Sequence, residues 1–203
     1  MKVTKLFLAS SNPGKLAEYV ELARGSGVTV ELLPRFDEFP SFKESAPTFA
    51  ENSAGKALHY SRFTEELVLA DDSGLVVAAL DGEPGVHSAR YAGPGASDAD
   101  RVEKLLREMR GKVGKERRGR FVCVTAVAQA GRAIAVVSDL APGMITFEPR
   151  GAGGFGYDPV FLSEELGRTY AELAREEKNA YSHRGKSFRK LLYMLSPGNA
   201  APS

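Results

Sequence analysis

Short apolar runs, separated by polar or glycine-containing stretches, mark the first half of the chain. A run of this length between turn-forming residues predicts a buried strand. The predicted strands lie at residues 3–9, 29–33, 67–70 and 75–80. We expect the third strand to end abruptly at Asp71-Asp72-Ser73-Gly74, because adjacent acidic residues followed by Ser-Gly are typical of a turn.

Segments with helical periodicity lie between these runs and have recognisable starts. Asn12 is a good N-cap and Pro13 suits the first helical position. Thr48 and Glu51 have the spacing of a capping box that opens a second helix, expected to run to about residue 62. Ser97 is placed to cap a third helix. The last predicted helix buries Phe188, Leu191, Leu192 and Leu195.

Two neighbouring runs, residues 121–130 and 133–139, are joined at Gly131-Arg132 and predict an antiparallel hairpin. Strands that alternate with helices, together with one hairpin, predict an α/β protein. We expect a mixed central sheet flanked by helices.

Composition limits the class of protein. The 203 residues are 43% hydrophobic and 26% charged, which excludes wholesale disorder and suits a single domain over residues 1–203. Residues 196–203 are expected to form a flexible tail. The formal net charge of +1 argues against a surface devoted to nucleic acid. No apolar run suits a signal peptide or a membrane span, so we expect a cytoplasmic protein.

The only cysteine, Cys123, excludes an intramolecular disulfide and a cysteine-based zinc site. It lies in an apolar run, where a buried structural cysteine is the expected role.

The first candidate for chemistry is the polar loop from Ser10 to Lys15, between a predicted strand and a helix start. Backbone N–H groups, the helix dipole and Lys15 would together attract an anion, most naturally phosphate. The spacing does not match a Walker A loop. A well-capped helix after a strand would explain the segment equally well.

The second candidate is the pair Asp71 and Asp72. Two adjacent carboxylates repel each other unless a cation or a proton intervenes. Successive strand residues point to opposite faces, so only one of them is expected to reach a given pocket. Oxygen ligands of this kind favour magnesium, and an Asx-type turn is the alternative.

Two segments near the carboxyl end are also candidates. The glycine-rich stretch 151–158 allows close backbone approach to a ligand, and Phe155 and Tyr157 offer flat faces for stacking. Residues 176–184 are dense in polar groups just before the last helix. A flexible turn and a solvated helix entry are the alternatives. The basic run at residues 110–120 is expected to be a solvated loop.

Taken together and in this order, the polar segments resemble the inosine triphosphate pyrophosphatase family, whose members remove non-canonical purine nucleotides. The resemblance is carried by Leu-Ala-Ser-Ser-Asn-Pro-Gly-Lys at 8–15, Thr-Phe-Ala-Glu-Asn at 48–52, Ala-Asp-Asp-Ser-Gly-Leu at 70–75, Pro-Gly-Val-His-Ser-Ala-Arg-Tyr at 84–91, Gly-Phe-Gly-Tyr-Asp-Pro at 154–159 and Ser-His-Arg at 182–184. It spans nearly the whole chain.

The resemblance implies hydrolysis of a nucleoside triphosphate such as ITP, dITP or XTP to the monophosphate and pyrophosphate, with Mg²⁺, by a homodimer. It implies two lobes with the substrate in a cleft between them. Glu44 and Asp72 would serve the metal, and Asp72 would also be the catalytic proton acceptor. The implied substrate-binding residues are Ser10, Ser11, Asn12, Pro13, Gly14, Lys15, Lys56, Ser73, Phe155, Gly156, Tyr157, Asp158, Lys178, His183 and Arg184.

The chain departs from the family pattern at a few positions. Lys43-Glu44 stands where many members have two glutamates, so the metal assignment rests on Glu44. His87 replaces a tyrosine or aliphatic residue, and Tyr181 replaces an isoleucine. We expect these changes to affect substrate preference rather than abolish activity.

The residues suggest a mechanism in which water attacks the α-phosphorus and pyrophosphate leaves. A free aspartate has a pKa near 3.9 and a neighbouring cation lowers that pKa, so Asp72 would orient the water and accept its proton late. Donors such as Arg184, His183 or backbone N–H groups would favour a 6-oxo base over adenine.

Three other functions remain open on the sequence. A Maf-type nucleotide pyrophosphatase has a different base preference, and a nucleotide-binding regulator would lack catalysis. A nucleic-acid-binding module would rest on the basic run at 110–120.

Overall fold

The computed structural model describes residues 3–196, in which strands and helices alternate along the chain. The strands are β1 (Lys5–Leu8), β2 (Thr29–Leu32), β3 (Val68–Val77), β4 (Arg118–Gln129), β5 (Arg132–Ile145) and β6 (Phe161–Ser163). The α-helices are α1 (Pro13–Ala23), α2 (Phe49–Tyr60), α3 (Asp98–Glu108), α4 (Arg175–Tyr181) and α5 (His183–Leu195). Residues 197–203, most of the predicted tail, lie outside the described residues.

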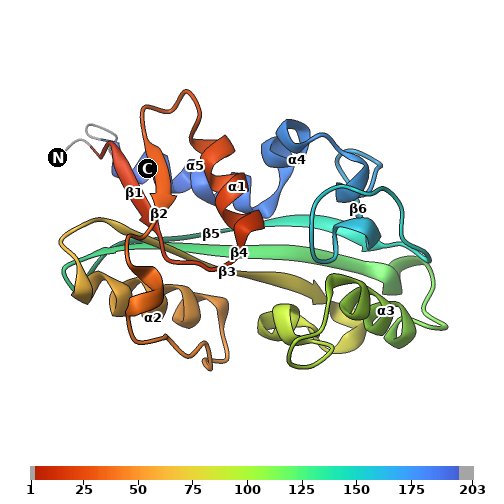
Figure 1. Cartoon of the computed structure of the whole chain (residues 1–203). Helices are drawn as coiled ribbons and strands as arrows, with labels where there is room; N and C mark the ends of the chain where they lie inside the picture. Colours follow the sequence, from red (N-terminus) through yellow and green to blue (C-terminus); the bar gives the residue numbers. More distant parts are fainter. Residues whose placement is uncertain (1–2, 197–203) are drawn as a thin grey trace, which may run out of the picture. The chain divides into compact units, whose positions relative to one another are not determined.

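One mixed sheet has the strand order β2-β1-β3-β4-β5-β6 (Figure 1). Strand β1 runs parallel to β2 and to β3, whereas β5 and β6 are antiparallel. The predicted α/β class with a mixed sheet is confirmed.

The chain divides into two compact units, each with its own apolar core. Unit 1 contains the described residues up to 72 together with 123–139 and 184–196, and unit 2 contains 73–122 and 140–183. Strands β3, β4 and β5 contribute residues to both units. The predicted single domain and the predicted cleft stay predictions.

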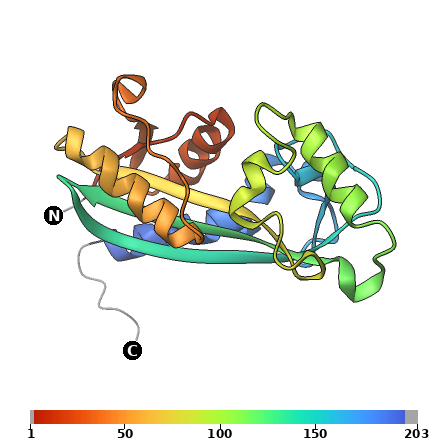
Figure 2. The same ribbon diagram turned by 90° about the horizontal axis from the view of Figure 1, so that it is seen from below.

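In unit 1, helices cover both faces of the sheet. Tyr19 of α1 and Phe188 of α5 pack with Leu69 of β3 in one cluster. Ala57 of α2 packs with Ala70, the next residue of β3, in another. Because successive strand residues point to opposite faces, α1 and α5 lie on one face and α2 on the other, as Figures 1 and 2 show.

The predicted helix starts are confirmed. The side chain of Asn12 accepts a hydrogen bond from the backbone of Lys15 (3.1 Å), and that of Thr48 accepts one from Glu51 (3.2 Å). Ser97 forms a full capping box, with Asp100 as the third helical residue. These signals lie within four residues of one another, which is why the sequence alone contains them.

The predicted break after residue 70 is wrong, because β3 runs without interruption through Asp71 and Gly74 to Val77. The two acidic residues do not form a turn, since each is buried beside polar partners from helices.

The hairpin is confirmed but is longer than predicted. Its turn lies at Ala130-Gly131, where φ is 46° and 75°, one residue earlier than expected.

Two polar segments contain buried charged or polar residues. Residues 175–181 form helix α4, and Lys178, Asn179 and His183 are buried, so the alternative of a solvated helix entry does not hold for these three residues. Within the basic run, Arg117 is only 4% exposed. Its guanidinium donates to the backbone oxygens of Met109, Lys112, Ile145 and Thr146 at 2.6–3.2 Å. The solvated loop predicted there is therefore wrong at this residue, because four carbonyl acceptors replace its water.

Among the described residues, the helices are too short or too polar to cross a membrane.

The Cys123 side chain is fully buried, as predicted. Burial, and then the nearby Asp71 carboxylate, raise the pKa of its thiol to about 11. We expect Cys123 to resist iodoacetamide at pH 8 in the native protein, because only about one molecule in 10³ would carry the thiolate. After denaturation the pKa returns to about 8.5 and alkylation should be complete within minutes. Mass spectrometry of timed samples measures this, and rapid labelling of the native protein would contradict it.

Candidate active site

The loop before α1 forms hydrogen bonds within itself. The hydroxyl of Ser10 accepts from the backbone N–H of Asn12 (3.2 Å), and the Asn12 side chain accepts from that of Lys15. Two of the predicted anion-binding N–H groups therefore already have partners. Ser11 and Pro13 are exposed and Gly14 is half-buried. The remaining attraction for phosphate comes from the helix N-terminus and Lys15.

The Lys15 side chain extends from α1 to the sheet, where its Nζ lies 3.0 Å from Asp71 Oδ1. On the same carboxylate, Oδ2 accepts from Arg184 at 3.2 and 3.3 Å. Arg184 also pairs with Glu18. Burial alone would raise the pKa of Asp71, but Lys15, Arg184 and Lys56 hold it well below its usual range. Asp71 is therefore a buried anion among cations.

The Asp72 side chain points to the opposite face of the sheet from that of Asp71, because successive strand residues alternate between the two faces. Its Oδ2 accepts a hydrogen bond from Asn52 of α2 at 3.0 Å. Asn52 also holds the loop before α2, since it donates to the backbone oxygen of Ala46 and accepts from the Ala46 N–H. Burial, and then repulsion from Glu44, raise the pKa of Asp72 to about 6. Lys15 and Lys56 lower this pKa, as expected of neighbouring cations, but burial and Glu44 outweigh them.

Glu44 and Lys56 form an ion pair on the α2 side. The Lys56 Nζ also donates to the backbone oxygen of Asp71 at 2.7 Å. Burial alone would lower the pKa of Lys56, but the carboxylates of Asp71 and Glu44 outweigh it and raise that pKa.

The donors on this side fit a divalent cation. Glu44 and Asp72 are close enough for one to raise the pKa of the other, and a cation would relieve that repulsion. No group of three acidic, His or Cys side chains suited to a metal occurs among the described residues. Two carboxylates nevertheless suffice for Mg²⁺, which fills its other positions with water and substrate phosphates.

In unit 2, Lys178 of α4 pairs with Asp158, and both side chains are buried. The carboxylate of Asp158 also accepts the backbone N–H of Phe155 at 2.9 Å. The Lys178 Nζ lies 4.9 Å from the centre of the Phe155 ring and 5.6 Å from that of Tyr170. One carboxylate thus holds both the lysine and the glycine-rich loop.

Other contacts order the same unit. The Tyr157 hydroxyl donates to the backbone oxygen of Ser88 (2.9 Å), and the Gly156 N–H donates to Asp98 (2.7 Å). The His183 ring stacks on Phe121 with centroids 4.6 Å apart and planes 8° apart. The aromatic side chain of Tyr157 is therefore part of the core rather than an open stacking face.

Gly154 cannot be replaced without cost. Its φ is +72°, and a Cβ added there would lie 2.0 Å from Asp158 Oδ2. We expect Gly154→Ala to destabilise the protein by about 1–3 kcal/mol, because it adds backbone strain to a displaced carboxylate. Urea unfolding measures this. Gly167→Ala is the matched control, because it shares a positive φ (+65°) but has no atom within 4 Å of the added Cβ. Equal losses in the two variants would contradict the role of Asp158.

The structure groups the predicted residues by unit. Lys15, Glu44, Lys56, Asp72 and Arg184 surround the middle of β3 in unit 1. Asp158, Phe155 and Lys178 form the group in unit 2, and Ser73 follows Asp72 in β3.

Sequence reasoning missed three residues that hold these groups. Glu18 pairs with Arg184, Asn52 binds Asp72, and Phe121 stacks on His183. Asn52 is the last residue of the motif at 48–52 that carried the family resemblance. Glu18 lies three residues after Lys15, and therefore on the same face of its helix. These two positions were weak indications in the sequence that both residues belong to the site.

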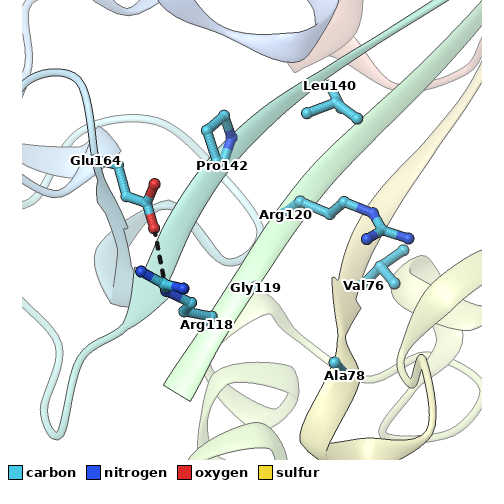
Figure 3. A pocket seen from close by; sticks show the side chains of 8 residues that line it. All are labelled: Val76, Ala78, Arg118, Gly119, Arg120, Leu140, Pro142 and Glu164. Carbon is cyan, nitrogen blue, oxygen red and sulfur yellow. Dashed lines mark ion pairs between the residues drawn. The ribbon is translucent and has the colours of Figure 1, made fainter. Parts of the chain in front are cut away.

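A separate groove of about 340 Å³ in unit 2 contains none of the predicted site residues (Figure 3). Leu140 and Pro142 of β5, Val76 of β3, and the Arg118–Glu164 ion pair (3.7 Å) line it. This groove is therefore not the predicted substrate site.

Comparisons with known proteins agree with the resemblance. The model of the Ham1 family matches residues 6–194. A Geobacillus kaustophilus protein named dITP/XTP pyrophosphatase is 51% identical over 187 residues, 92% of each chain. The solved HAM1 protein of Coxiella burnetii is 40% identical with a TM-score of 0.83, covering 95% of this chain and 98% of that one. A Mycobacterium abscessus nucleoside-triphosphatase, also titled dITP/XTP pyrophosphatase, is 40% identical with a TM-score of 0.74, covering 94% and 99%. Family, fold and sequence thus agree, and the chain belongs to the Ham1 family.

Proposed function

We propose that the chain hydrolyses non-canonical purine nucleoside triphosphates (ITP, dITP and XTP) to the monophosphate and pyrophosphate. The observation that carries the proposal is the polar cluster beside β3, where Asp72 lies among Glu44, Lys56 and Asn52. Relatives that are named dITP/XTP pyrophosphatase and are about half identical over most of their length support the same activity.

Charge explains why such a site needs several cations. A triphosphate carries about four negative charges, and electrostatic neutralisation is the main contribution to this class of transfer. Lys15, Lys56 and Lys178 supply three positive charges. In our proposal the loop 10–15 with Lys15 binds phosphate oxygens, as do Lys56 and Ser73. Each lysine side chain is already held by an ion pair with a carboxylate, so little side-chain entropy remains to be lost when the substrate binds.

Glu44 and Asp72 would hold Mg²⁺, which would neutralise phosphate charge and polarise a water when bound. Asp72 would orient the attacking water and accept its proton at a carboxylate oxygen. Asn52 keeps the carboxylate in place by donating to Oδ2.

Base recognition is assigned to His183, Arg184 and the loop 155–158. Phe155 is half-buried and can stack on a base. The guanidinium of Arg184 donates to Asp71 and pairs with Glu18, and the N–H groups of Phe155 and Gly156 donate to Asp158 and Asp98, so we assign the contact with a 6-oxo acceptor to His183. Donors that adenine leaves unpaired would reject it.

A substrate panel tests the function, with pyrophosphate and phosphate detected separately, with and without Mg²⁺. We expect pyrophosphate from ITP, dITP and XTP, and kcat/KM for ATP lower by about 10²-fold or more, because a buried unpaired donor is costly. Comparable values for ATP and ITP would refute the base assignment. Preference for pyrimidine triphosphates would favour a Maf-type enzyme, and binding without pyrophosphate release would favour a regulator.

We also propose that the protein is a cytoplasmic homodimer, on the basis of the family resemblance. Light scattering on a sizing column measures the assembly, and a mass of one chain of 21.8 kDa would contradict it.

A further inference from the structure

The side chain of Asp71 is fully buried in the middle of β3, yet three cations converge on it. Lys15 of α1 reaches Oδ1 at 3.0 Å, and Arg184 of α5 reaches Oδ2 at 3.2 Å. Lys56 of α2 donates to the backbone oxygen of the same residue at 2.7 Å. All three belong to the predicted substrate-binding set, and they come from three different helices.

The three cations around Asp71 are balanced by three carboxylates, those of Asp71, Glu44 and Glu18. Lys56 also pairs with Glu44, and Arg184 also pairs with Glu18. Lys15 differs, since Asp71 is its one carboxylate partner within residues 3–196. Because no part of the Asp71 side chain is exposed, it cannot touch a ligand itself. The Lys15 side chain is 15% exposed and can.

We infer that Asp71 is a positioning residue that holds Lys15 in its phosphate-binding orientation, whereas Asp72 on the opposite face carries the proton. A free lysine side chain has about 2 kcal/mol of rotamer entropy to lose on binding. An ion pair inside the protein removes much of that cost before substrate arrives, and pre-organised charge needs no further rearrangement. This inference rests on the proposed function.

Asp71→Asn and Glu18→Gln form a matched pair for the test. Each removes one buried carboxylate charge from Arg184, but only the first also releases Lys15. For Asp71→Asn we expect KM for ITP to rise, and kcat/KM to fall, by about 10- to 100-fold, since small misplacements of this kind cost about 10². For Glu18→Gln we expect a smaller rise in KM than for Asp71→Asn, because Lys15 keeps its carboxylate partner. A purely structural role would lower the active fraction, and hence kcat, with KM unchanged.

A double variant shows whether Asp71 acts through Lys15. If it does, Asp71→Asn has little further effect on KM in a Lys15→Met background, because the group it holds is gone. The double variant removes one charge of each sign, so it can be measured even if Asp71→Asn alone does not fold, and its KM should then match that of Lys15→Met. Additive effects in the cycle, or equal KM values for Asp71→Asn and Glu18→Gln, would overturn the inference. Failure of the proposed function would look different, since the wild type itself would release no pyrophosphate from ITP.

Discussion

Asp72→Asn is expected to lower kcat for ITP hydrolysis by about 10²–10⁴-fold, the usual contribution of a general base. Asparagine has the same shape but cannot accept the proton. Its side-chain oxygen can still accept the hydrogen bond from Asn52, so the fold should persist. Nucleotide affinity, measured by calorimetry, should stay within a few-fold of the wild type, and stopped pyrophosphate assays give kcat.

Asp139→Asn is the control for this variant. Asp139 ends the part of β5 that lies in unit 1, pairs with Lys190 at 2.7 Å and is not one of the predicted site residues. Its kcat should be within about 2-fold of the wild type, as for a substitution outside the site. Hydrolysis of ITP by Asp72→Asn at a near wild-type rate would remove Asp72 from the mechanism.

Lys178→Met should cost about 3–5 kcal/mol of unfolding free energy, because it leaves the Asp158 carboxylate buried without its ammonium partner. Lys178 and Asp158 are 4% and 2% exposed, so water cannot replace the lost charge. The glycine-rich loop should loosen as well, since the same carboxylate accepts the Phe155 N–H. Urea unfolding gives the stability, and KM for ITP should rise.

Lys190→Met provides the comparison. The Lys190 side chain is 56% exposed, so its ion pair with Asp139 is screened by solvent and should be worth less than about 1 kcal/mol. If the two methionine variants had similar unfolding free energies, the buried pair in unit 2 would not be the stabilising contact described above.

Local signals account for the parts of the fold that the sequence predicted well. The apolar run that forms β1 is followed within five residues by Asn12 and Pro13, and the structure begins α1 at that proline. Ser97 with Asp100 works in the same way for α3. The candidate residues were found through motifs in a fixed order along the chain, and the family model matches residues 6–194.

The two sequence-based predictions that the structure contradicts both concern charged residues. Asp71 and Asp72 have the composition of a turn but lie within a ten-residue strand. Arg117 belongs to a basic run, yet it is buried because backbone oxygens from residues 109 and 145 happen to surround it. In both places the partners are supplied by other elements, so the composition around the residue carries no signal of them.

The sequence by itself determined the helix starts, the alternation of strands and helices, and the family, because caps and apolar periodicity act over a few neighbouring residues. Only the tertiary structure decided which charges are buried and what each one holds. Arg184 reaches Asp71 across 113 positions in the chain. A charge can leave water only when its partner arrives with the folded backbone, so the different surroundings of Asp71 and Asp72 are a property of the assembled sheet and helices.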